Sequence, residues 1–387
     1  MKKSAKVLSL VMAAAMMCAA FAGCGKKSYT ANNKEYVIGV SGPLTGAAAI
    51  YGNGVKNGAQ LAVDEINAAG GLNGVKFRLE VTDDMHDATK VATNYASLLE
   101  KGMQASLGCV TSAPCAEWTN LSHEDNVFFL TPSASNDDIP KYDNGYQMCF
   151  ADGDQGKAAA SYVNENFKGQ TIGVFYKSDD NYSSGIFKQF KSNLDSSVKV
   201  VETLFTDAGA TSFDSQINEL KDCKFIFMPI YYTPATIFMT QAKGKIADDA
   251  VYYGCDGFDG IDSTKGFDIK SIPQEVSMLS HFDSSATTGA AGDFIKKYTE
   301  KYGKETLNQF GASAYDCVYA IYGAMKEAKV DDVTISASDL CDVLKDSFKT
   351  YKLKNAVTGG GSDVSWNKDG KVKKSAIKFV IKEADKA

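Results

Sequence analysis

The chain has 387 residues, a length that suits two domains of about 150 to 200 residues each better than one core. Apolar residues make up 44% and charged residues 23%, the proportions of a soluble globular protein. The formal net charge of -6 argues against a nucleic-acid partner, which usually meets a basic surface.

The N-terminus predicts an export signal. Three lysines within residues 2–6 precede an apolar segment, residues 7–20, that is too short to span a membrane but has the length of a secretory signal. It ends in Phe-Ala-Gly-Cys at residues 21–24, which resembles the bacterial lipobox, with Phe21 where leucine is commonest. Residues 1–23 are therefore predicted to be a lipoprotein signal peptide and Cys24 the lipidated residue. Ordinary cleavage with a free thiol is the alternative.

The segment after Cys24 predicts a tether. Residues 24–34 are rich in Lys, Ser and Asn, as flexible linkers are. No later segment has about 18 consecutive apolar residues. We therefore expect an exported protein that a lipid anchor holds at the outer face of the cell membrane.

Seven cysteines follow Cys24, an odd number that cannot form a complete set of disulfides. No two of them are spaced as C-x-x-C. The favoured interpretation is buried free thiols, although the spacing also permits a local bridge between Cys109 and Cys115. The seven are Cys109, Cys115, Cys149, Cys223, Cys255, Cys317 and Cys341.

Residues 36–72 predict the first unit of an α/β fold. A β-rich run over residues 36–40 suits a parallel strand buried on both faces. A glycine-punctuated loop leads from it into a helix, whose N-terminal N–H groups suit an anion. The loop glycines do not form G-x-G-x-x-G, which argues against a dinucleotide.

The motifs of this unit also identify a family. Residues 42–46 (GPLTG), the pair Tyr51-Gly52 and the helix end at residues 66–71 (INAAGG) occur in that order. They resemble the branched-chain-amino-acid (Leu/Ile/Val-binding) type of ABC-transporter substrate-binding protein, a type I periplasmic binding protein. The resemblance extends over about residues 35–387. It implies an α/β fold with two Rossmann-like lobes of parallel strands, joined by a three-crossover hinge.

Alternating β-rich and helical patterns continue along the chain and predict parallel α/β lobes. A helical return to the first lobe is expected over residues 294–328, and the tail predicts a hairpin with a turn at Asp369-Gly370. Strands are expected at residues 75–81, 105–110, 127–131, 171–176, 198–204, 225–230, 251–254 and 377–381.

Crossovers are expected near residues 150, 280 and 357. They divide the chain into an N-terminal lobe, residues 35–150 and 281–357, and a C-terminal lobe, residues 151–280 and 358–387.

Ligands of doubly wound sheets bind beyond the carboxyl ends of the strands. The loops after the strands at residues 105–110 and 127–131 carry hydroxyls and backbone N–H groups but no charged side chains. A zwitterion needs such donors for its carboxylate and an acid for its ammonium. The resemblance assigns first-lobe contacts to Ser112, Ser133, Ala134 and Ser135, and the ammonium acceptor to Asp256, where the family commonly has Glu.

The resemblance also implies an aromatic wall of Tyr51, Tyr182 and either Tyr231 or Tyr232. Tyrosine provides apolar area and one hydroxyl. Each of these tyrosines could instead be part of the core. Val110, Thr111 and Trp118 are further possible pocket residues, and core packing is an equally open interpretation of Trp118.

Other chemistry is weakly indicated. The three histidines lie in separate stretches and no serine stands in G-x-S-x-G. The acids and histidine within residues 83–87 could suggest a metal, but the acidic pair there fits a loop brace better. Residues 152–158 fail the spacing of a phosphate loop. We therefore predict no catalytic residues, no metal and no cofactor.

The expected function is that of a monomeric receptor that binds a free amino acid, apolar or branched-chain, between its lobes and delivers it to ABC permease subunits. One alternative is the same fold binding an amide, urea or another small polar solute. A sensor without transport is a second alternative, and a secreted hydrolase a distant third.

Overall fold

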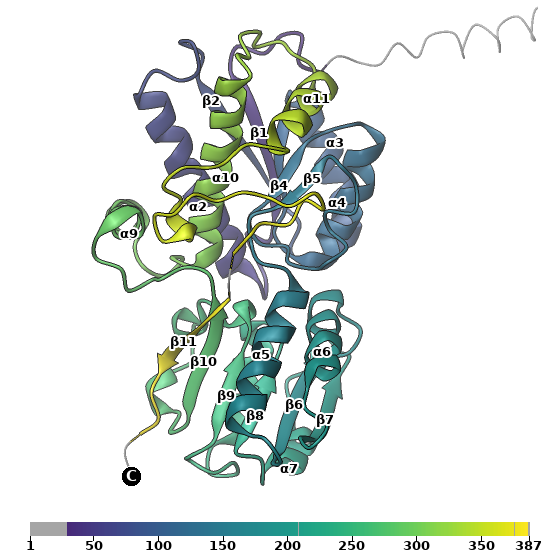
Figure 1. The fold of residues 1–387 in the computed structure, drawn as a ribbon, viewed down its shortest axis with the longest axis vertical. Helices are drawn as coiled ribbons and strands as arrows, with labels where there is room; N and C mark the ends of the chain where they lie inside the picture. The colour runs from purple at the N-terminus through teal and green to yellow at the C-terminus, as the bar shows by residue number, and fades with distance from the viewer. Residues whose placement is uncertain (1–28, 208, 375, 386–387) are drawn as a thin grey trace, which may run out of the picture.

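The computed structural model describes residues 29–207, 209–374 and 376–385. The predicted signal peptide, Cys24 and the first part of the tether lie outside the described residues. The rest forms two α/β lobes stacked along the long axis of the molecule (Figure 1). The predicted fold class is confirmed, since each lobe is a mostly parallel sheet flanked by helices.

The first lobe contains a five-stranded parallel sheet in the order β2-β1-β3-β4-β5. Helices α2 and α10 cover one face, and α3 and α4 cover the other. The elements are β1 (Tyr36–Gly42), α2 (Ala49–Ala68), β2 (Phe77–Asp83), α3 (Val91–Glu100), β3 (Ala105–Cys109), α4 (Ser112–Glu124), β4 (Phe129–Thr131), β5 (Gly145–Gln147), α9 (Gly289–Tyr302), α10 (Gln309–Glu327) and α11 (Ala337–Phe348).

The second lobe contains a six-stranded sheet in the order β11-β10-β9-β8-β6-β7, parallel except for the pairing of β10 with β11. Its elements are α5 (Asp152–Asn166), β6 (Thr171–Lys177), α6 (Asn181–Asn193), β7 (Lys199–Phe205), α7 (Asp214–Leu220), β8 (Phe225–Met228), α8 (Tyr232–Ala242), β9 (Val251–Gly254), β10 (Glu275–Ser280) and β11 (Ile377–Lys382).

Apolar side chains on successive strand residues explain why this second sheet is covered on both sides. Side chains alternate between the two faces of a strand. In β6, Val174 packs in the cluster that includes α5 and α6, while Phe175 packs with α7 and α8. Near-continuous apolar runs of this kind are typical of parallel strands buried on both faces.

Helices α2 and α10 approach closely because glycines face each other at their crossing. A methyl group at Gly58 would lie inside van der Waals contact distance of the Gly311 carbonyl, and one at Gly54 would meet Asn308. The obstacle at Gly58 is backbone, which cannot rotate aside. This contact therefore fixes the distance between the two helices.

Replacing Gly58 with alanine is therefore expected to destabilise the protein by about 1–3 kcal/mol, because the helices must separate. Urea unfolding followed by circular dichroism measures this loss. Gly209→Ala is the control, since its methyl group would be 3.4 Å from the nearest atom, an ordinary contact. A stability of Gly58→Ala equal to that of the control would contradict the close approach.

Three crossovers connect the lobes, but the third lies later than expected. Trp366 packs between Tyr146 and Phe348 and donates its Nε1–H to the Gln147 carbonyl, so this part of the tail belongs with the first lobe. Only β11 joins the second sheet. The third crossover therefore lies between Lys374 and β11 rather than near residue 357. We propose that residues 358–374 belong to the first lobe and that the chain rejoins the second lobe at β11.

The tail also departs from the predicted hairpin. A turn at residues 369–370 brings Trp366 and Val372 into an isolated antiparallel bridge, but the strand after it pairs with β10 of the other lobe. The sequence patterns did not predict β5 or β10. β5 has only three residues, and β10 ends at residue 280, where a crossover is expected from the sequence.

All seven cysteines between residues 109 and 341 are buried and free in the structure, in agreement with the favoured interpretation. Burial raises the pKa of their thiols, Cys109 and Cys255 included, which keeps them protonated and unreactive at neutral pH. Within the described ranges, no helix has both the length and the apolar character needed to cross a membrane.

Candidate ligand-binding site

A small cavity lies between the lobes, at the carboxyl ends of their strands. Its first-lobe wall comes from the starts of α2, α4 and α10 and the loop after β4, and its second-lobe wall from the starts of α6 and α8 and the turn after β9. This is where doubly wound sheets bind ligands. The lining residues are Tyr51, Val110, Thr111, Ser112, Ser133, Ser135, Tyr182, Tyr231, Asp256, Gly257 and Phe310.

The first-lobe wall presents hydroxyls and helix-start N–H groups. Ser112 is the first residue of α4, and its Oγ accepts a hydrogen bond of 3.3 Å from the Asn136 N–H. Ser133 and Ser135 follow β4 in a loop shaped by the Thr131 hydroxyl, which accepts from the Ser133 N–H. The unpaired N–H groups of a helix start favour an anion such as a carboxylate.

The second-lobe wall is centred on Asp256, which is 1% exposed. Tyr182 donates its hydroxyl to Oδ1 at 2.7 Å, and the Asp256 N–H donates to Gln155 Oε1 at 3.0 Å. Its other carboxylate oxygen, Oδ2, has no hydrogen-bond partner among the described residues. A buried acceptor without a donor is costly, so this oxygen indicates a missing cationic or N–H partner.

Burial sets the charge of this acid. Desolvation raises the pKa of Asp256 to about 6, partly opposed by the hydrogen bond from Tyr182. Desolvation and the nearby Asp256 also raise the pKa of Asp152 well above its ordinary value. Both shifts disfavour two negative charges in this buried space, so an ammonium beside Asp256 would stabilise its ionised form.

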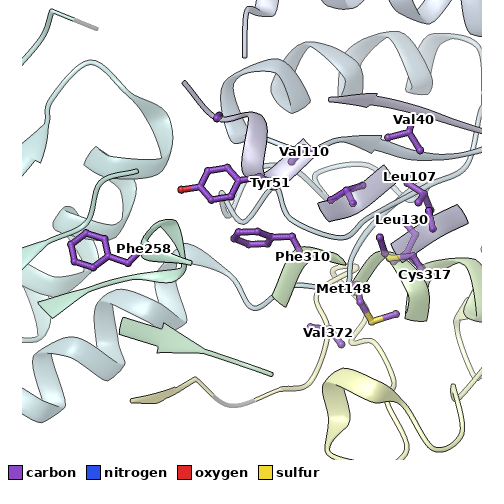
Figure 2. Close-up of a cluster of buried hydrophobic side chains, with 14 of the residues drawn as sticks. Val40, Tyr51, Leu107, Val110, Leu130, Met148, Phe258, Phe310, Cys317 and Val372 are labelled. Atoms are coloured by element: carbon purple, nitrogen blue, oxygen red, sulfur yellow. The ribbon is translucent and has the colours of Figure 1, made fainter. Parts of the chain in front are cut away.

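Aromatic rings enclose the space beside Asp256. Tyr182 and Tyr231 stack with centroids 4.7 Å apart, and Tyr51 meets Phe310 edge-on at 5.0 Å. Figure 2 shows Tyr51 and Phe310 side by side, with the Tyr51 hydroxyl pointing toward the lobe that contains Phe258. These rings give the cavity apolar walls with polar edges.

The lobes are closed on each other. Tyr51 donates its hydroxyl to the Gly257 carbonyl at 2.5 Å, and the Gln309 N–H donates to Asp259 Oδ2 at 2.7 Å. The cavity volume is about 10 Å³, enough for about one water molecule. A solute as large as an amino acid therefore needs the lobes to separate before it can enter.

Nine of the twelve residues suggested from the sequence line this cavity. The structure also distinguishes the two neighbouring tyrosines: Tyr231 lines the cavity, while the Tyr232 hydroxyl turns to the Ile50 N–H at 3.3 Å. The nine are Tyr51, Val110, Thr111, Ser112, Ser133, Ser135, Tyr182, Tyr231 and Asp256.

Two other suggested residues, Ala134 and Trp118, do not line the cavity. The Ala134 carbonyl accepts from Gln147 Nε2 at 2.8 Å, inside the first lobe. Trp118 is fully buried against Tyr95, with centroids 4.9 Å apart, so it belongs to the core and does not form a pocket floor.

The structure adds Gly257 and Phe310 to the site. Gly257 follows Asp256 directly and could have been included on that ground. Phe310 is the second residue of α10. This helix follows α9 and not a strand, so the rule that ligands bind beyond the carboxyl ends of strands does not predict Phe310. Its neighbour Asn308 caps that helix by accepting from the Gly311 N–H, a pattern that predicts a helix start but not a pocket.

The acidic pair at the end of β2 braces a loop, as expected. Asp83 accepts from the Leu44 N–H and the Thr45 hydroxyl, and Asp84 accepts from the Ser41 hydroxyl. The part of the chain that the structure describes contains no cluster of three or more His, Cys, Asp or Glu arranged to hold a metal ion.

The fold and the cleft define a two-lobed solute-binding protein. Residues 35–369 match the periplasmic binding protein family. The chain belongs to this family, with the type I fold of its branched-chain-amino-acid group, as its motifs predicted.

Curated relatives support the assignment. A leucine-, isoleucine-, valine-, threonine- and alanine-binding protein of Pseudomonas aeruginosa is 30% identical over 264 residues, covering 66% of this chain and 68% of the relative. The Leu/Ile/Val-binding protein BraC3 of Rhizobium johnstonii is 27% identical over 342 residues, covering 82% of this chain and 91% of the relative.

Solved structures share the fold. The branched-chain amino acid transporter substrate-binding protein LivJ of Streptococcus pneumoniae, in complex with isoleucine, has a TM-score of 0.73 at 27% identity, covering 89% of this chain and 100% of that one. An ABC-transporter solute-binding protein of Rhodopseudomonas palustris, in complex with 3,4-dihydroxybenzoic acid, has a TM-score of 0.77 at 14% identity, covering 91% and 94%.

Proposed function

We propose that the protein is an extracytoplasmic solute-binding receptor of an ABC importer, which binds a free amino acid between its lobes. Its role is to bind and deliver, not to catalyse. The observation that supports the ligand class best is the unpartnered Oδ2 of buried Asp256, opposite the hydroxyls and helix-start N–H groups of the other lobe. One wall suits an ammonium and the other a carboxylate.

Binding and closure are linked in this proposal. Ser112 and Ser135 lie on the first lobe and Asp256 on the second, so only the closed form holds both ends of the ligand. The ligand therefore stabilises the closed form through contacts that the open form lacks. We propose that membrane permease subunits recognise this form of the monomer.

Calorimetry with the common amino acids and a set of control solutes tests the proposal. A few charge-assisted hydrogen bonds, less desolvation and ordering, correspond to about micromolar affinity, or about -8 kcal/mol. We expect such affinity for at least one amino acid. Binding of aromatic acids, amides or urea alone would contradict the ligand class, and product formation from a solute would contradict a receptor without catalysis.

We also propose that Cys24, which lies outside the described residues, carries the lipid anchor. Cys24→Ser is expected to release the protein from the membrane fraction of cells, because a lipid chain supplies the membrane affinity. Fractionation and labelling with a fatty-acid analogue measure this. Continued labelling of the serine variant would contradict the assignment.

A further inference from the structure

We propose that the amino acid which this cleft prefers has a hydrogen-bonding side chain, such as that of threonine or asparagine, and not the purely aliphatic one that the resemblance implies. The inference rests on the proposed function. It concerns the groups in the lining of the cleft that the ammonium and carboxylate of the ligand would leave without a partner.

The lining of the cavity is rich in hydroxyls. Seven of its eleven residues are Ser, Thr or Tyr, and only Val110 and Phe310 have hydrocarbon side chains. A pocket selective for an aliphatic group needs hydrocarbon on most sides, because each buried polar group must find a partner.

Several of these hydroxyls already have partners. Tyr182 donates to Asp256, Tyr51 donates to the Gly257 carbonyl, and Ser112 accepts from Asn136. The Thr111 hydroxyl lies 2.8 Å from His86 Nδ1. These groups are therefore held in place, and Ser112 keeps a proton to donate to a carboxylate.

The Tyr231 hydroxyl is different. Its oxygen is buried and has no hydrogen-bond partner in the described part of the chain, and the residue lines the cavity. The Tyr231 ring stacks on Tyr182. It also contacts the His86 ring in a T-shaped arrangement, with the two centroids 5.2 Å apart. The Tyr231 side chain is half-buried, and these two ring contacts hold it beside the cavity when the lobes are closed.

A ligand with a side-chain hydroxyl or amide would satisfy this oxygen, whereas an aliphatic ligand would leave it buried and unpaired. A site with a fixed polar group discriminates strongly against the analogue that lacks the matching group, more strongly than a hydrophobic pocket discriminates by size. Near-isosteric ligand pairs isolate this effect, since threonine and valine have almost the same shape.

The test is calorimetric titration of the full protein with valine, threonine, leucine and asparagine. We expect threonine to bind at least tenfold more tightly than valine, and asparagine more tightly than leucine. Tyr231→Phe should reduce the threonine-to-valine ratio at least fivefold. Tyr252→Phe is the matched control: it removes another buried, unpartnered hydroxyl, on β9 and outside the cavity, and should keep the ratio.

Aliphatic ligands that bind as tightly as their polar partners, or a ratio that Tyr231→Phe leaves unchanged, would overturn the inference. If these aliphatic ligands lose affinity in Asp256→Asn, the proposed function survives and only the side-chain class is wrong. If no amino acid binds, or if Asp256→Asn binds as well as the unaltered protein, the proposed function itself fails.

Discussion

Replacing Asp256 with asparagine is expected to weaken amino-acid binding by about 2–5 kcal/mol, at least about thirtyfold in Kd. Asparagine keeps the shape of the side chain but removes the charge that an ammonium needs. The loss should be large because Asp256 is 1% exposed, so solvent cannot screen or replace the interaction. Isothermal titration calorimetry of both proteins with the same amino acid measures the change.

Asp84→Asn is the matched control. Asp84 is also buried, and desolvation raises its pKa to about 6, but it braces the first-lobe loop and does not line the cavity. Its replacement should leave Kd within about twofold. Equal losses in the two variants would show that buried acids affect binding only through stability, contrary to a direct contact with the ligand.

Affinity is also expected to depend on pH in a direction fixed by Asp256. The ammonium needs the ionised carboxylate, and burial raises the pKa of this acid to about 6. Kd should therefore be nearly constant above pH 7 and should rise about tenfold for each pH unit below 6, as the carboxylate takes up a proton. Titrations between pH 5 and 8 measure this, with Asp256→Asn giving a flat profile.

The stability of the ligand-free protein should depend on pH in the opposite direction: the part that Asp256 contributes should fall as the pH rises. Since the pKa of Asp256 is higher in the folded protein than its ordinary value of 3.8, the folded state holds the proton more tightly than the unfolded chain. The stability from this group is fully present below pH 3.8 and is lost as the pH rises through 6, by about 3 kcal/mol. Amino-acid binding should therefore raise the melting temperature more at pH 7.5 than at pH 5. A ligand-induced shift that is larger at pH 5 would contradict this linkage.

Much of the fold could be predicted because its signals are local. The expected first-lobe strand at residues 36–40 and the second-lobe strand at residues 251–254 correspond to β1 and β9, where apolar β-branched and aromatic residues lie between turn residues. Short elements lack such signals. β5 has three residues and forms through its pairing with β4, a tertiary contact that no local pattern reveals.

The candidate site was predictable where it follows strand ends. Ser112, Ser135 and Asp256 follow β3, β4 and β9 by three, four and two residues, and the topology brings them to one cleft. Phe310 reaches the cleft from a helix start that depends on the packing of α10 against α2, so only the folded structure reveals it. The wrong third crossover has a similar origin, because Trp366 is held to the first lobe by a hydrogen bond to a distant carbonyl.

A crystal structure of the protein with an amino acid that calorimetry shows to bind tests the central claim most directly. The ligand should lie between Tyr182 and Tyr51, with its ammonium within about 3 Å of Asp256 Oδ2 and its carboxylate on the N–H groups and hydroxyls around Ser112 and Ser135. A ligand bound elsewhere, or one in the cleft with Asp256 out of contact with its ammonium, would contradict the account.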